Sequence, residues 1–169
     1  MIGLINIKEL DCSYNTISTL NVLGMPNITT LNCSYNALTT LDLNGLSQLT
    51  KLHCGNNLLT SLDVNTFTNL TNLSCNNNKL TTLDVNNLTN LDYLQCGANK
   101  LSGLNVNNLT KLTNLHCSGN ELTNLDVSNL TSLLYLGCSV NQLTSLDLTA
   151  LTKNLDIECP VCEEEVLID

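Results

Sequence analysis

Cysteine recurs every 21 residues through almost the whole chain, and this spacing constrains the fold more than any other feature. Asparagine keeps the same interval, three residues after each cysteine. Two residue types in register at one period indicate a repeat protein, in which each unit buries its apolar side against its neighbours. The cysteines are Cys12, Cys33, Cys54, Cys75, Cys96, Cys117, Cys138 and Cys159, and the asparagines are Asn15, Asn36, Asn57, Asn78, Asn99, Asn120 and Asn141.

The repeated unit reads L-x-x-L-x-C-x-x-N-x-L-T-x-L-D-V-x-x-L-T-x. In one copy, Leu94 and Cys96 alternate with Tyr93, Gln95 and Gly97, which is the period of two expected of a half-buried strand. The second half is rich in threonine, asparagine and valine, which are poor helix formers. We therefore expect one domain over residues 1 to 169, a right-handed and predominantly β solenoid of seven to eight coils, with short strands or 3₁₀ turns on its convex side and no long helices.

The first half of the unit matches the leucine-rich-repeat signature, with cysteine in the last aliphatic position of the strand. With L-D-V in the second half, the units resemble bacterial leucine-rich repeats of the internalin type, above all those with a cysteine ladder. This resemblance implies a solenoid of the α/β horseshoe class whose concave strand face binds a protein, and a secreted or cell-surface location. Because Met1 leads directly into the repeats, we expect no signal peptide in this chain.

The inward cysteine row has three interpretations. Metal binding requires ligands that converge on one point, and disulfides require Cβ atoms that face each other, whereas these side chains run parallel along a line. We therefore predict a ladder of buried free thiols. The inward asparagines are predicted to bond backbone groups of their own and the adjacent coil.

The last repeat departs from the pattern. Cys159 and Cys162 form a C-P-x-C sequence, followed by the acidic run Glu163 to Glu165. We interpret residues 154 to 169 as a modified acidic C-terminal capping repeat. A local redox pair or a truncated metal-binding module remains an alternative for the two cysteines.

The outward strand positions vary from coil to coil while the rest of the unit hardly changes. Aromatic side chains contribute much of the energy of protein interfaces, so these positions form the candidate binding face. Alternatively, these surface positions vary by neutral sequence change and bind no ligand. The predicted partner-binding residues are Lys51, His53, Tyr93, Gln95, His116, Tyr135, Tyr14 and Tyr35.

Several functions are disfavoured by the composition. The net charge is −9 and every one of the six cations is a lysine, which argues against nucleic-acid binding. No apolar run is long enough to insert into a membrane. His53 and His116 lie three coils apart, roughly 14 Å, too far to share a metal or a substrate proton. We predict no enzyme activity, no metal and no cofactor.

Two further rows repeat on the other sides of the coil. An aspartate row is predicted to bond turn amides, although a carboxylate column could also bind Ca²⁺. A threonine row supports an alternative function, an ice-binding solenoid, and a structural segment of a larger surface protein is another. Self-association, if it occurs, is expected to pair two N-terminal ends. The rows are Asp42, Asp63, Asp84, Asp126 and Asp147, and Thr39, Thr60, Thr81, Thr123 and Thr144.

Overall fold

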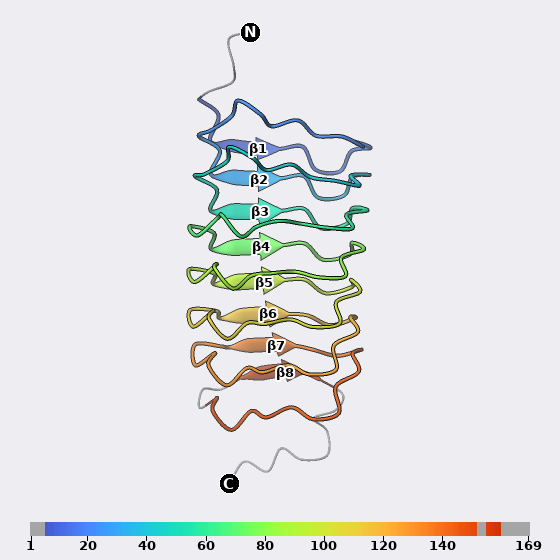
Figure 1. Cartoon of the computed structure of the whole chain (residues 1–169), viewed down its shortest axis with the longest axis vertical. Helices are drawn as coiled ribbons and strands as arrows, with labels where there is room; N and C mark the ends of the chain where they lie inside the picture. Colours follow the sequence, from blue (N-terminus) through green and yellow to red (C-terminus); the bar gives the residue numbers. More distant parts are fainter. Residues whose placement is uncertain (1–5, 152–154, 160–169) are drawn as a thin grey trace.

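The computed structural model describes residues 6–151 and 155–159, and these form a stack of β-coils (Figure 1). Eight three-residue strands make one parallel sheet in chain order, and the described residues contain no helix. The predicted solenoid is confirmed. The strands are β1 (Glu9–Asp11), β2 (Thr30–Asn32), β3 (Lys51–His53), β4 (Asn72–Ser74), β5 (Tyr93–Gln95), β6 (Asn114–His116), β7 (Tyr135–Gly137) and β8 (Asp156–Glu158).

The register between strands equals the sequence period. Leu52 lies opposite Leu31 on one side and Leu73 on the other, so equivalent positions of successive coils face each other. The hydrogen-bond ladder continues beyond the strands, because the backbone N–H of Cys54 donates to the carbonyl of Ser74 at 2.8 Å. Every row of the sequence is therefore a row in space.

The core is a column of leucine, valine and cysteine side chains inside the coils. In the third coil, Leu49, Leu52, Cys54, Leu59 and Val64 have no exposed surface. Fully burying one leucine is worth about 1.5–3 kcal/mol, so repetition of this set in each coil is the main stabilising contribution. The end coils are only partly covered, at Ile7, Leu10, Ile17 and Leu20 and at Leu146, Leu151, Leu155 and Ile157.

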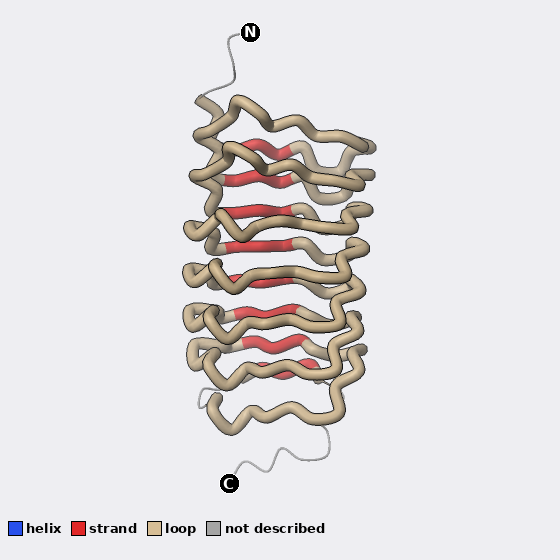
Figure 2. Tube along the Cα trace, in the orientation of Figure 1, coloured by secondary structure: helices blue, strands red, loops and turns tan. Residues whose placement is uncertain are grey.

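Two consecutive turns shape the side of each coil that leads into the strand. The N–H of Phe67 donates to the carbonyl of Val64 at 3.1 Å, and that of Leu70 donates to the carbonyl of Phe67 at 2.9 Å. These are i→i+3 bonds of single turns, and Figure 2 draws these segments as loops and turns. The chain reverses here without a helix, which keeps each coil short.

The predicted C-terminal capping repeat lies largely outside the described residues, together with Cys162 and the run Glu163 to Glu165. Cys159 is described, and it is buried at the end of the cysteine row. Its placement on the row agrees with the 21-residue period.

Candidate functional site

The inward asparagines join neighbouring coils through three kinds of hydrogen bond. The Nδ2 group of Asn57 donates to the carbonyls of Cys33 (3.0 Å) and Cys54 (3.1 Å), and its Oδ1 accepts from the N–H of Leu38 (3.0 Å). This confirms the predicted asparagine ladder. The same three kinds of bond occur at Asn36, Asn78, Asn99, Asn120 and Asn141. Among the described residues, Asn15 of the first coil bonds only carbonyls of its own coil.

The cysteine row is a ladder of free thiols, as predicted. Of the eight described cysteines, seven are buried and Cys12 is half-buried. Burial raises the pKa of Cys33 to about 12, and the neighbouring thiol of Cys12 adds to the effect. Burial also raises the pKa of Cys54 well above its usual value. The thiols are therefore neutral and pack as small apolar groups.

The outward residues on either side of each strand leucine form two parallel rows, which we call the strand face. On β5, for example, Tyr93 and Gln95 flank the fully buried Leu94. Alternation along each strand places them on the surface of the sheet. The rows are Glu9, Thr30, Lys51, Asn72, Tyr93, Asn114, Tyr135 and Asp156, and Asp11, Asn32, His53, Ser74, Gln95, His116, Gly137 and Glu158.

Three rings of the strand face meet on β5, β6 and β7. The ring centroids of Tyr93 and His116 are 5.4 Å apart with a tilt of 42°. Those of His116 and Tyr135 are 4.3 Å apart with a tilt of 28°. The structure thus brings together three of the predicted binding residues, from three different coils. We call Tyr93, His116 and Tyr135 the aromatic cluster.

Gly137 makes room for the last ring of the cluster. A Cβ atom on Gly137 would lie 3.0 Å from the hydroxyl oxygen of Tyr135 and 3.2 Å from its Cε1. Because that space is open, Tyr135 lies across its own strand and donates its O–H to Oε2 of Glu158 at 2.8 Å. Glu158 and Gly137 were not among the predicted binding residues. The sequence shows that they share a row with His116, but not that Tyr135 reaches across that row.

The side chains of the aromatic cluster are uncharged, and they lie beside the carboxylates of β8. Burial raises the pKa of Tyr135 to about 12, and its hydrogen bond to Glu158 adds to the effect. Partial burial lowers the pKa of His116, against the opposing charge of Glu158. At pH 7 the imidazole and the phenol are therefore uncharged. The carboxylates of Asp156 and Glu158 lie next to them on β8.

Lys51 and His53 lie apart from the aromatic cluster, because β4 separates their strand from β5. Partial burial lowers the pKa of His53, and the charge of Lys51 adds to this while Asp11 opposes it. Asn32 donates its Nδ2 to Oδ2 of Asp11 at 3.0 Å. The strand face therefore has a mixed-charge half, β1 to β4, and an aromatic half, β5 to β8. Gln95 belongs to the aromatic half, opposite His116 in the register.

Tyr14 and Tyr35 were predicted to belong to the strand segments, but they lie beyond the strands. Both occupy the turn after a strand, each with a left-handed φ of 54°. Their rings stack at 4.3 Å with a tilt of 10°, and the side chains are 74% and 46% exposed. They lie beyond the strands because the chain turns directly after the cysteine of each coil. They form a separate aromatic pair at the edge of the strand face.

The aspartate row bonds turn amides, as predicted. Oδ1 of Asp126 accepts from the N–H of Ser128 at 3.0 Å and from its hydroxyl at 2.7 Å. Equivalent bonds to the N–H two residues on occur at Asp42, Asp63, Asp84 and Asp147. Within residues 6–151 and 155–159, no group of three or more His, Cys, Asp or Glu could hold a metal ion.

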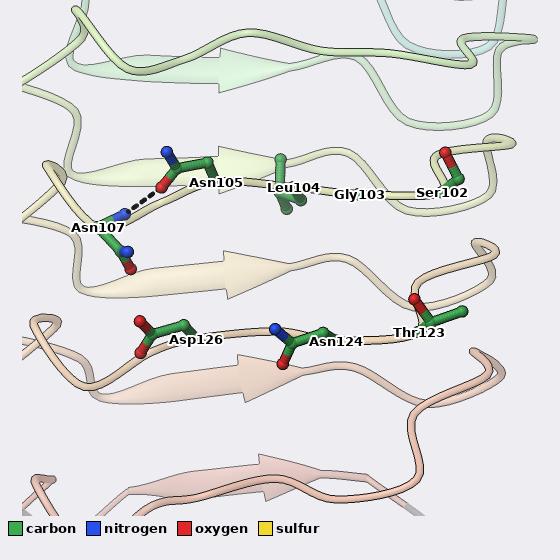
Figure 3. Close-up of a pocket in the computed structure, with 8 residues that line it drawn as sticks. All are labelled: Ser102, Gly103, Leu104, Asn105, Asn107, Thr123, Asn124 and Asp126. Carbon is green, nitrogen blue, oxygen red and sulfur yellow. Dashed lines mark hydrogen bonds between the residues drawn. The ribbon is translucent and has the colours of Figure 1, made fainter.

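The threonine row is exposed along the stack, but it is not continuous. Ser102 takes the place of a threonine in the row, and Ser102 and Gly103 border a shallow hollow, which Asn105, Thr123 and Asp126 also line (Figure 3). The surface opposite the strand face is therefore uneven at its middle. In the part of the chain that the structure describes, no helix is suited to crossing a bilayer.

Solved structures with the same architecture include internalins. The functional domain of InlJ from Listeria monocytogenes, which includes a cysteine ladder, is 34% identical with a TM-score of 0.77, over 94% of this chain and 45% of that one. An internalin from the same organism, InlF, is 27% identical with a TM-score of 0.84, over 93% and 48%. A leucine-rich-repeat protein from Leptospira interrogans is 29% identical with a TM-score of 0.82, over 91% and 43%.

The resemblance inferred from the repeats is confirmed by these structures, each of which is more than twice as long as the region that this chain matches. Neither a protein-family model nor a curated protein sequence matches the chain. The likeness covers the fold, the period and the cysteine ladder.

Proposed function

We propose that this chain, a leucine-rich-repeat solenoid with internalin-like repeats, is a non-catalytic scaffold that binds a protein partner on its strand face. The observation that carries the proposal is the aromatic cluster. Three rings from three coils meet on a surface whose other positions are mostly small or polar. Clustered tyrosines are typical of the residues that dominate binding energy at protein interfaces.

The rest of the strand face would supply complementary contacts around the cluster. Gln95 lies beside it, and Lys51 and His53 would contact a partner that extends along the sheet toward β3. Tyr14 and Tyr35 would contribute only to a partner that also reaches past the edge of the strands. Because the aromatic cluster carries the proposal and lies apart from Lys51 and His53, the aromatic half is the first target for mutation. Pairing of N-terminal ends is not supported by the comparisons and is not part of the proposal.

The proposal is tested by capture on the immobilised chain from extracts of the source organism and of cells it contacts. A protein that the wild type retains should be lost from the double variant Tyr93→Ala/Tyr135→Ala, by tenfold or more. The matched control is Thr81→Ala/Thr123→Ala, which removes two exposed side chains from the opposite surface. Equal loss from both variants, or retention by both, would contradict binding on the strand face.

An ice-binding function would use the threonine row. The regular exposure of Thr60, Thr81 and Thr123 favours it, while Ser102, which takes the place of a threonine in the row, weakens it. Thermal hysteresis of the pure protein distinguishes the two functions. Clear hysteresis that disappears in a Thr60→Val/Thr81→Val/Thr123→Val variant would replace the protein-binding proposal.

A further inference from the structure

The aromatic cluster lies in the more acidic part of the strand face. From β5 to β8, the strand positions carry two carboxylates, Asp156 and Glu158, and no lysine. Lys100 and Lys111 are outside these strands, and Nζ of Lys111 donates to Asn90 Oδ1 at 2.7 Å; Lys153 lies outside the described residues. On β1 to β4, by contrast, Lys51 accompanies the acidic residues. Among the described strand residues, the aromatic half therefore has local negative charge and no lysine.

The rings are arranged so that a cation could meet both a π face and a carboxylate. The hydrogen bond from Tyr135 fixes Glu158 at one end of the ring series, 2.8 Å from the phenol oxygen. Among the described residues, no hydrogen bond is found to Oε1 of Glu158, which can accept from an incoming donor. Tyrosine faces attract cations within about 6 Å of the ring centroid. Tyr93 and Tyr135 are both partly exposed and so offer such faces.

We propose that the aromatic cluster and Glu158 bind a cationic side chain, an arginine in preference to a lysine, presented by an exposed segment of the protein partner. The preference follows from shape, because a planar guanidinium stacks on a ring and donates several N–H groups to a carboxylate, whereas an ammonium is a compact point charge. This inference rests on the proposed function and adds the chemistry of the partner. A neutral polar or sugar ligand would use the rings but would not need Glu158.

The test is a titration of the full ¹⁵N-labelled chain with N-acetyl-arginine amide, followed by two-dimensional NMR at constant ionic strength. The amides of β5 to β8 should shift along a saturable curve, and those of β1 to β3 should not. N-acetyl-glutamine amide and methyl glucoside are the neutral probes and should bind at least fivefold more weakly. Equal binding of a neutral probe, or the absence of saturable shifts with the arginine probe, would overturn the assignment.

Matched variants separate a specific site from general attraction to an acidic protein. Glu158→Gln should weaken the arginine probe at least fivefold, and Tyr135→Leu, which removes the ring bonded to that carboxylate, should weaken it at least threefold. Asp11→Asn is the control, because Asp11 occupies the same row as Glu158 on β1, away from the cluster, and should change affinity by less than twofold. If Asp11→Asn weakens binding as much as Glu158→Gln, the attraction is non-specific and the proposal is wrong. The spectra of the free variants report directly whether each one is folded.

The two proposals can fail separately. If the arginine probe does not bind while partner capture still depends on Tyr93 and Tyr135, the cationic assignment is wrong and the scaffold function stands. If the probe binds at the cluster but the Tyr93→Ala/Tyr135→Ala variant still captures the partner as well as the wild type does, the partner does not bind at the strand face. In that case the scaffold proposal is the one that fails.

Discussion

Replacement of Asn57 by alanine should be among the most destabilising polar changes in the chain. The change removes the acceptor of the buried N–H of Leu38 and one of two amide donors from the carbonyls of Cys33 and Cys54. Each carbonyl keeps a second donor, from Asn36 or Asn78. A buried donor left without a partner costs about 1–3 kcal/mol, so the loss should be about 2–3 kcal/mol, most of it at Leu38.

Urea unfolding followed by far-UV circular dichroism measures this loss. The control is Asn87→Ala, because Asn87 is an exposed asparagine in a turn, and its removal should change the free energy of unfolding by less than about 0.5 kcal/mol. Equal losses for the two variants would refute the ladder argument.

The variant Asn57→Asp separates the two functions of the amide. Its carboxylate can still accept from Leu38, but it cannot donate, and it faces the carbonyl oxygens of Cys33 and Cys54. It should destabilise at pH 7 at least as much as alanine. Those contacts raise the pKa of the new carboxyl in the folded state, so part of the stability should return as the pH falls and the group protonates. A loss that does not shrink on acidification would show that the donor bonds contribute little.

Three other predictions concern groups with shifted pKa values. In native protein the buried thiols should react slowly with a thiol reagent, with Cys12 the fastest of the described cysteines, and rapid reaction of several would contradict the ladder. Gly137→Ala should displace the ring of Tyr135 from Glu158, and the pKa of Tyr135, about 12, should fall because its hydrogen bond to the carboxylate is lost. Ultraviolet titration of the tyrosines measures this pKa, and an unchanged value would contradict the prediction. Burial lowers the pKa of His116 below its unfolded value of about 6.5. The melting temperature should therefore fall as pH drops through 6.5 to 5.5, and less so in His116→Gln.

The periodic features could be predicted from the sequence because a strict 21-residue register converts sequence rows into spatial rows. The thiol ladder, the asparagine ladder and the outward position of Tyr93 all follow from that one property. The Asp126 turn could also be predicted, since its bonds involve only residues two positions away.

Features that depend on the direction of a side chain or on backbone conformation could not be predicted in the same way. Tyr135 reaches Glu158 only because Gly137 has no side chain, which is a relation among three residues on two strands. Tyr14 lies in a turn with positive φ, a conformation that tyrosine does not favour. Val140 adopts the same conformation at the equivalent position, although β-branched residues disfavour it even more. Each of these residues precedes a ladder asparagine, so the turn belongs to the repeat and not to the residue type.

Ring-to-ring contacts in solution test the central claim most directly, namely that residues from three coils form one site on the strand face. Nuclear Overhauser measurements should show the imidazole of His116 in contact with both Tyr93 and Tyr135, as the centroid distances of 5.4 and 4.3 Å require. Cross-peaks from His116 to only one of these rings, or to neither, would mean that the three rings do not meet in solution, and the site would not exist as a unit.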